Sequence, residues 1–207
     1  MNAELPKNPD EMPHNLPAQQ TPYVWRDVFG NDNPVELEVG VGKGRFLLTS
    51  AEANPDVNFV GIEWARKYWR LCLKRANYRK LPNIRFMRDD AADTFQLALS
   101  DNCLRAVHVY FPDPWPKKRY RKRRLIQTPF LDQMVRVVED GGLLKLATDH
   151  VDYFEQMDEV TAAHPRLEVI ERLVGEESRE GITNYEVKYR EEGRTIHNIT
   201  CRVLAAE

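Results

Sequence analysis

Along the chain, short apolar runs alternate with segments whose apolar residues recur every three to four positions. The short runs are typical of buried strands, and the periodic segments are typical of helices. We expect strands at 35–40, 57–63, 83–88, 104–111 and 141–149. We expect helices at 44–53, 64–80, 91–100, 124–139 and about 150–163. Alternation of this kind predicts a mostly parallel sheet with helices on both faces.

The two ends of the chain depart from this alternation. Residues 167–173 and 195–205 are expected to close the sheet as an antiparallel pair. The fold class is then α/β, a Rossmann-like, doubly wound, mostly parallel seven-stranded sheet with an antiparallel closing strand. Residues 1–33 are rich in Pro, Asn and Gln and have no hydrophobic period, so we expect a flexible or loosely docked arm before a domain at 34–207.

A glycine-rich loop follows the first expected strand. It reads Glu-Val-Gly-Val-Gly-Lys-Gly over residues 38–44, with glycines at Gly40, Gly42 and Gly44. Glycines let a backbone turn tightly and approach a ligand closely. The spacing differs from the G-x-G-x-x-G of dinucleotide-binding loops, and position 45 is an arginine. Alone, the loop is equally consistent with a strand-to-helix turn that tolerates glycine.

Acidic residues at successive strand ends add to this loop. Glu63 ends the second expected strand, where a carboxylate accepts hydrogen bonds from ribose hydroxyls. Asp89 and Asp90 follow the third, although Asp90 is also a good helix N-cap. Glu38 would repel a pyrophosphate but suits a positively charged ligand, such as the sulfonium and ammonium groups of S-adenosylmethionine. The pattern therefore favours methyl transfer over an NAD-dependent reaction.

The stretch Phe-Pro-Asp-Pro-Trp-Pro at 111–116 follows the fourth expected strand. Its prolines restrict the backbone around Asp113, which we expect over the sheet edge beside the cofactor, unless it only stabilises a turn. Trp115 offers a surface on which a base could stack, or else it covers the core. Seven of the eight residues at 117–124 are cationic. Such runs are often solvated surfaces, but the position of this one favours RNA phosphates.

Composition limits the alternatives. The 207 residues carry a formal net charge of -2, so a nucleic-acid surface must be local. Cys72, Cys103 and Cys201 lack the spacing of zinc ligands and fit reduced thiols, so we expect no metal and a cytoplasmic protein. The start of the chain lacks the apolar region of a secretory signal, and no window approaches a membrane span, so we expect no membrane association. No obligate protein partner is implied, and either a monomer or a homodimer remains open.

Six motifs in this order resemble the bacterial tRNA (guanine-N7)-methyltransferase family. They are E-x-G-x-G-x-G at 38–44, GIE at 61–63, DA at 90–91, FPDPWPKKR-x-x-KRR at 111–124, TDH at 148–150 and TNYE at 183–186. The proline-rich block with its basic extension is highly specific, and the resemblance covers nearly everything from residue 35 onward. Tyr120 and Arg121 stand where the family often has histidines, which adds charge.

The resemblance implies methylation of N7 of a guanosine in the tRNA variable loop, with S-adenosylmethionine as cofactor. Asp113 would be the catalytic residue and would also lie at the cofactor. The other cofactor-binding residues would be Glu38, Gly40, Gly42, Gly44, Glu63 and Asp90. The tRNA would be held by Lys117, Lys118, Arg119, Arg121, Lys122, Arg123, Arg124, Asp149, Thr183, Asn184, Tyr185 and Glu186.

Two readings from other classes stay open. A non-catalytic RNA-binding module on a methyltransferase scaffold would require a broken cofactor loop, and this loop is intact. A methyltransferase that acts on protein or on a small molecule would leave the basic run unexplained.

Overall fold

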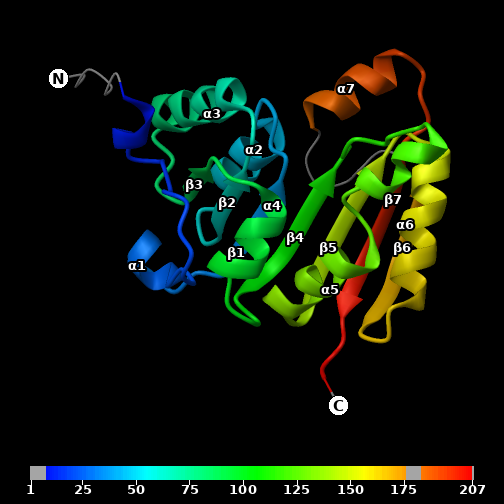
Figure 1. Cartoon of the computed structure of the whole chain (residues 1–207). Helices are drawn as coiled ribbons and strands as arrows, with labels where there is room; N and C mark the ends of the chain where they lie inside the picture. Colours follow the sequence, from blue (N-terminus) through cyan, green and yellow to red (C-terminus); the bar gives the residue numbers. More distant parts are fainter. Residues whose placement is uncertain (1–7, 176–182, 207) are drawn as a thin grey trace.

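A computed structural model of the chain describes residues 8–175 and 183–206, and a seven-stranded sheet forms its centre (Figure 1). The strand order is β3-β2-β1-β4-β5-β7-β6. The bounds are β1 Val35–Val39, β2 Asn58–Ile62, β3 Ile84–Met87, β4 Leu104–Tyr110, β5 Val138–Thr148, β6 Leu167–Val174 and β7 His197–Val203. Neighbours among β1 to β5 pair in parallel, whereas β7 is antiparallel to both β5 and β6. The predicted fold class is confirmed.

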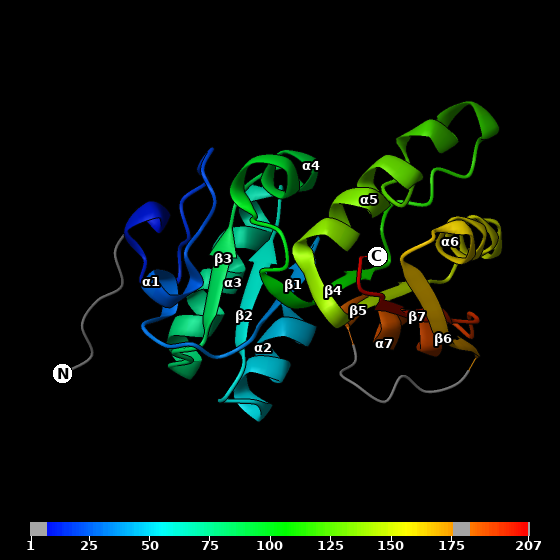
Figure 2. The same ribbon diagram turned by 90° about the horizontal axis from the view of Figure 1, so that it is seen from below.

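Helices cover both faces of the sheet (Figures 1 and 2). On one face lie α2 (Arg45–Ala53) and α3 (Arg66–Arg79). On the other lie α4 (Ala91–Asp93), which continues into the π-helical turn η2 (Thr94–Ala98), α5 (Thr128–Val137) and α6 (Val151–Ala163). Each face buries its own apolar cluster, with Leu47 and Leu73 on the first and Leu131 and Tyr153 on the second. Burial of each such side chain stabilises the fold by roughly 1.5–3 kcal/mol.

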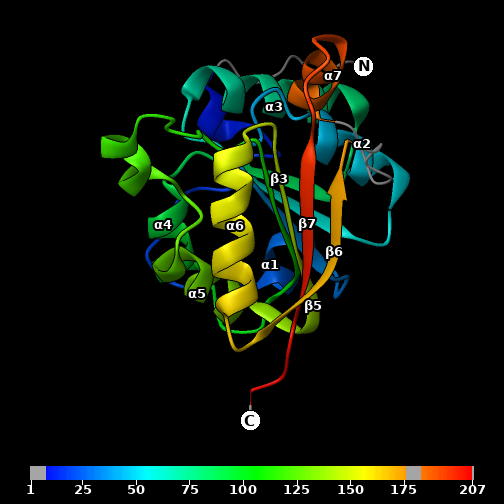
Figure 3. The same cartoon turned by 90° about the vertical axis from the view of Figure 1, so that its right-hand side faces the viewer.

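Parallel pairing brings the carboxyl ends of β1 to β5 to one edge of the sheet. Above this edge lies α7 (Asn184–Glu191), next to the point where β6 ends and β7 begins (Figures 1 and 3). The six-residue 3-10 helix η3 (Lys118–Arg123) follows β4 on the side of α6. Neither α7 nor η3 was predicted. Thr183 starts α7 as a side-chain cap, since its hydroxyl accepts from the backbone N–H of Glu186 at 3.0 Å.

The segment before β1 was expected to be a flexible or loosely docked arm, and its described part, residues 8–33, is docked on the sheet. The 3-10 turn η1 (Pro9–Glu11) and helix α1 (Trp25–Phe29) lie in it, and Met12, Leu16 and Tyr23 are buried. Backbone hydrogen bonds join His14 and Leu16 to Phe86 of the edge strand β3, at 2.8 and 2.9 Å. The apolar residues are too widely spaced to show a period, yet they fasten an extended segment. Residues 1–7 lie outside the described residues, and the boundary at 33/34 stays a prediction.

Most elements lie within two residues of the expected bounds, and three differ more. The helix at 124–139 begins only at Thr128, where Pro129 suits a first turn, and β5 begins at Val138 instead of residue 141. The helix expected at 91–100 is an α-helical turn followed by a π-helical turn.

Candidate active site

A cavity of about 580 Å³ opens at the carboxyl ends of β1, β2, β3 and β4. The predicted site residues that line it are Gly40, Gly42, Glu63, Asp90, Asp113, Arg123 and Tyr185. The structure therefore brings together residues from five separate motifs. Tyr68 of α3, Leu125 and Asp89 also line the cavity, although none of them was predicted as a site residue. Trp64, directly after Glu63, lines the cavity too and is 68% exposed, which is unusual for a tryptophan.

The glycine loop has the backbone that only glycine adopts easily. Gly40, Gly42 and Gly44 have φ values of +76°, +52° and +72°. A Cβ on Gly44 would lie 2.7 Å from the Sγ of Cys72 on α3, so the third glycine also permits close packing of the loop. These observations favour a specialised loop over a turn that merely tolerates glycine.

Glu63 joins the glycine loop to the loop after β2. Its two carboxylate oxygens accept from the backbone N–H groups of Gly42, at 2.8 Å, and Ala65, at 2.7 Å. Each oxygen keeps a second lone pair, and the residue lines the cavity. Glu63 can therefore position the loop and still accept hydrogen bonds from ligand hydroxyls.

Glu38 is a buried carboxylate beside this loop. It is 3% exposed, and its Oε2 has no hydrogen-bond partner among the described residues. Burial, and then the negative charge of Glu63, raise the pKa of Glu38 to about 8. A buried polar atom without a partner is costly unless a ligand supplies one. The unpartnered oxygen of Glu38 thus fits a ligand that places a positive charge or an N–H donor next to the glycine loop.

Asp90 caps a helix, which was the alternative to a cofactor contact for this residue. Its Oδ1 accepts from the backbone N–H groups of Ala92 and Asp93, at 2.8 and 3.4 Å, at the start of α4. Asp89 accepts from the hydroxyl of Thr94 at 3.1 Å. Asp90 also lines the cavity, and its Oδ2 has no hydrogen bond within the part of the chain that the structure describes. The two roles are compatible.

The Phe-Pro-Asp-Pro-Trp-Pro turn holds strained backbone on both sides of Asp113. Phe111 and Trp115 have φ values of +53° and +42°, although each precedes a proline. Such conformations of non-glycine residues cost about 1–3 kcal/mol each and persist only where neighbours enforce them. The N–H of Phe111 donates to the carbonyl oxygen of Ala147 on β5 at 2.8 Å. Asp113 is exposed and lines the cavity.

The position of the Arg124 side chain contradicts the predicted contact between this residue and an RNA phosphate. The side chain is buried at 2% exposure, and its guanidinium lies 4.8 Å from the ring centre of Tyr153. It donates to the carbonyl oxygen of Pro114 and to the side chain of Gln156, each at 2.8 Å, and pairs with Asp152. Its hydrogen-bond donors therefore hold the turn instead of an RNA.

The rest of the basic run, residues 117–123, is largely exposed. Arg121 also pairs with Asp152, at 2.6 Å. Arg123 lies 5.0 Å from the ring centre of Trp115 and lines the cavity. Arg119 lies 4.7 Å from the ring centre of Tyr120. Lys117, Lys118 and Lys122 have no side-chain ion pair among the described residues, so they can meet phosphates without losing a protein partner.

In the Thr183–Glu186 motif, some residues stabilise α7 and others line a cavity. Thr183 caps α7, and Glu186 is buried at 3% exposure and pairs with Arg190 at 2.7 Å, which argues against direct substrate contacts by either. Tyr185 lines the cavity, whereas Asn184 lines a neighbouring one. Asp149 is not among the residues that line the site and pairs with Arg194 at 2.7 Å.

Two further findings concern metal ions and membranes. Within residues 8–175 and 183–206, no group of three or more His, Cys, Asp and Glu side chains is arranged to hold a metal ion. No helix in the same ranges is both long and apolar enough to cross a membrane.

Comparison with known proteins identifies relatives of this chain. A curated tRNA (guanine-N(7)-)-methyltransferase from Cupriavidus pinatubonensis is 39% identical over 153 residues, which are 74% of this chain and 60% of that protein. One from Marinobacter nauticus is 45% identical over 138 residues, which are 67% of this chain and 58% of that protein. The chain thus spans about three fifths of the length of the curated relatives it matches.

Solved structures share the fold. The 16S rRNA methyltransferase KamB superposes with a TM-score of 0.66 at 16% identity, over 87% of this chain and 93% of that chain. TrmN from Thermus thermophilus superposes with a TM-score of 0.60 at 15% identity, over 86% of this chain and 47% of that chain. A family model described as "Putative methyltransferase" matches residues 32–199. Because this match covers most of the chain, the protein belongs to that methyltransferase family.

Proposed function

We propose that the protein transfers a methyl group from S-adenosylmethionine to N7 of a guanosine in the variable loop of tRNA. The products are 7-methylguanosine and S-adenosylhomocysteine, and the substrate implies work in the cytoplasm. The observation that carries the proposal is that one cavity joins the glycine loop, beside the unpartnered Glu38, to Asp113 on its rigid turn. The names of the curated relatives support the same reaction.

The acidic residues in and beside the cavity fit this cofactor. Glu38 would accept from its ammonium group, because Oε2 is buried without a partner. Glu63 would accept from the ribose hydroxyls with its remaining lone pairs, and Asp90 would accept from the adenine amino group with Oδ2. S-adenosylmethionine, when bound, supplies a methyl group made electrophilic by its sulfonium.

Asp113 would act by position and charge. Guanine N7 carries an in-plane lone pair and no proton, so a bond from N7 to the methyl carbon forms while the carbon–sulfur bond breaks, and no base is required. The purine gains positive charge in this step. A carboxylate that accepts from guanine N1–H and the exocyclic amino group orients the base and stabilises that charge.

The exposed cations next to Asp113 would bring the RNA to the cavity. Lys117, Lys118, Arg119, Lys122 and Arg123 follow directly on the turn and are exposed. Contacts of such residues to phosphates position an RNA without reading its sequence. The guanosine would leave its stack to enter the cavity, where Trp115 and Tyr185 offer aromatic faces.

One experiment tests the proposal. The protein is incubated with unmodified tRNA and S-adenosylmethionine labelled in the methyl group, and the modified nucleoside is mapped. We expect label in 7-methylguanosine at one variable-loop position. RNA binding without transfer would instead assign a non-catalytic RNA-binding protein, and label in protein or small molecules alone would assign another substrate class.

A further inference from the structure

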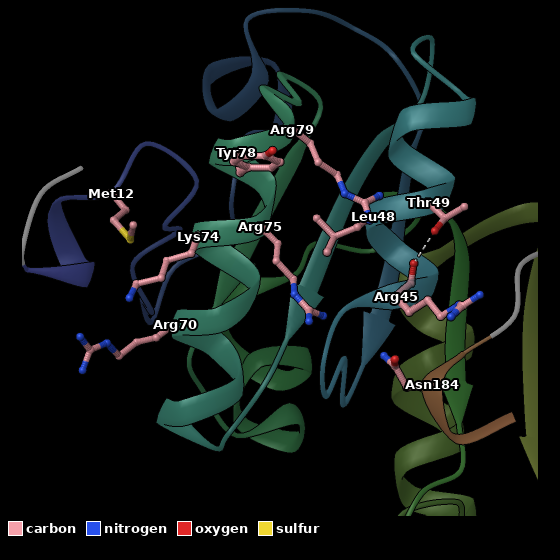
Figure 4. A pocket seen from close by; sticks show the side chains of 10 residues that line it. All are labelled: Met12, Arg45, Leu48, Thr49, Arg70, Lys74, Arg75, Tyr78, Arg79 and Asn184. Carbon is pink, nitrogen blue, oxygen red and sulfur yellow. Dashed lines mark hydrogen bonds between the residues drawn. The ribbon is translucent and has the colours of Figure 1, made fainter. Parts of the chain in front are cut away.

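A second cavity, of about 1230 Å³, lies on the surface of α3 (Figure 4). Its walls come from α2, α3, Met12 of the N-terminal segment and Asn184 of α7. We call it the basic groove, because five of its lining residues are cations: Arg45, Arg70, Lys74, Arg75 and Arg79. None of the described residues that line it is acidic. No negative charge among the lining residues therefore offsets these cations, although the whole chain carries a net charge of -2.

The five cations differ in how they are held. Arg75 donates to the carbonyl oxygen of Lys43 at 2.7 Å, and Arg79 pairs with Glu52 at 3.0 Å. Arg45, Arg70 and Lys74 are exposed, and no side-chain hydrogen bond or ion pair holds them among the described residues. Figure 4 shows Arg70 and Lys74 pointing away from α3 on the side of Met12, and Arg75 and Arg79 reaching toward α2. Three cations are thus free to meet an anionic partner.

Two elements, α7 and the glycine loop, link the groove to the active-site cavity. Asn184 lines the groove, and its neighbour Tyr185 lines the active-site cavity. Lys43, which accepts from Arg75, lies between Gly42 and Gly44 in the glycine loop. A polymer with one unit in the active-site cavity can therefore continue along the groove. The groove lies toward β3, whereas η3 pairs with α6 toward the other edge of the sheet.

From this placement we infer that the basic groove binds the phosphodiester backbone of the substrate RNA. It would be a second RNA-binding surface, toward the other edge of the sheet from residues 117–123. The inference rests on the proposed function for the identity of the RNA. The cations are spread over two helices, which suits successive phosphates better than one small anion. Tyr78, which is 87% exposed among these cations, offers a face on which a base can stack. Continuity with the active-site cavity favours the RNA over an acidic protein.

The test uses the full chain with Arg45→Gln, Arg70→Gln and Lys74→Gln combined. These side chains are exposed, and Arg75 is kept because it holds the glycine loop. tRNA binding is measured against salt concentration without cofactor, and methyl transfer is measured separately. We expect the slope of log K against log salt to shrink by roughly 2 to 3, since each lost phosphate contact removes about 0.7–0.9. KM for tRNA should rise on the order of 10- to 100-fold, with kcat and cofactor affinity little changed.

A matched control removes three cations elsewhere: Arg26→Gln, Arg172→Gln and Arg202→Gln. These side chains are 69%, 44% and 47% exposed and lie on α1, β6 and β7, outside the residues that line either cavity. We expect the control to keep the slope and KM of the original chain. If both triple variants weaken tRNA binding equally, the loss of net positive charge alone explains the effect, and the inference is overturned.

Other outcomes separate this inference from the proposed function. If the unaltered chain methylates tRNA and the groove variant matches it in slope and KM, the groove does not bind RNA and only the inference fails. If the groove variant loses binding of poly-glutamate but keeps its tRNA slope, the groove belongs to an acidic protein partner, which also overturns the inference. Absence of methyl transfer from the unaltered chain would count against the proposed function, while the salt slopes still decide whether the groove binds RNA.

Discussion

Arg124 donates from Nε to the carbonyl oxygen of Pro114 at 2.8 Å, so the last cation of the basic run holds the turn that presents Asp113. The turn carries positive φ at Phe111 and Trp115, and such backbone relaxes unless other contacts enforce it. Arg124 is anchored in turn by Gln156 of α6. The position of Asp113 thus depends on a side chain that does not line the cavity.

Arg124→Met should therefore impair both folding stability and turnover. Each lost hydrogen bond from a charged donor is worth about 1.5–3 kcal/mol, so the free energy of unfolding should fall by about 3 kcal/mol or more. Misplacement of Asp113 should lower kcat by roughly 10- to 100-fold. Urea unfolding and steady-state kinetics measure the two effects. Arg121→Met is the control, because Arg121 is 43% exposed and, of the partners of Arg124, pairs only with Asp152. If Arg121→Met lowers kcat as much as Arg124→Met does, the anchoring role of Arg124 is contradicted.

Asp113→Asn tests the charge of the carboxylate while its shape is kept. Loss of one preorganised electrostatic contact at a reacting centre typically lowers kcat by about 10²- to 10³-fold. We expect a fall of that order, with little change in the dissociation constant of S-adenosylmethionine measured by calorimetry. Asp56→Asn, at an exposed loop position, should leave both quantities unchanged. Full turnover by Asp113→Asn would remove this residue from the mechanism.

Gly44→Ala should damage the glycine loop through packing more than through backbone conformation. An added Cβ would lie 2.7 Å from Cys72 Sγ, at a φ of +72°. Gly30→Ala is a matched control, because Gly30 has a φ of +73° and nothing lies within 4 Å of its Cβ position. We expect Gly44→Ala to weaken cofactor binding at least tenfold and to cost about 1–3 kcal/mol more stability than the control. Adding Cys72→Ala should recover part of the loss.

If Cys72→Ala recovers neither binding nor stability in this double variant, the clash is not the cause. Thermal unfolding and cofactor calorimetry on the four proteins of the cycle give the coupling between positions 44 and 72 directly.

Much of the fold followed from the sequence because its signals are local. The strands β1 to β4 are short, largely apolar runs, and the loop at 38–44 shows its turn through the glycines themselves. The roles of Arg123 and Arg124 could not be separated in this way, since both belong to one cationic run. Only the packing of η3 against α6 shows that Arg124 points inward, while Arg123 lies over Trp115 at the cavity.

Long-range contacts explain the other differences. The segment around His14 and Leu16 has no period, and its order comes from the backbone of Phe86 some 70 residues further on. Helix α7 depends on the cap at Thr183 and packs with Tyr185 over the glycine loop, where a Cβ on Gly42 would meet the tyrosine ring at 3.8 Å. The contacts with Phe86 and with Gly42 leave no pattern in neighbouring residues, whereas the T-x-x-E spacing at 183–186 is that of a capping box.

Glu38 gives a prediction on pH, because burial and Glu63 raise its pKa from 4.5 to about 8. Between these values the folded protein retains a proton on Glu38 that the unfolded chain releases. The contribution of Glu38 to stability is therefore full below about pH 4.5 and is lost as pH rises through about 8. Glu38→Gln should remove this loss, so its stability relative to the unaltered chain should improve from pH 5 to 9, by up to about 1.4 kcal/mol per pH unit.

Urea unfolding of the unliganded proteins across this pH range measures the difference, with the exposed Glu139→Gln as control. A cationic ligand should bind the ionised carboxylate, so cofactor binding near pH 7 should release a proton from the unaltered chain. Calorimetry in buffers of different ionisation enthalpy detects that proton, and Glu38→Gln should not release it. Equal proton release from both proteins would show that Glu38 does not face the cationic group of the ligand, and the ammonium contact would then have to be sought at another residue of the cavity.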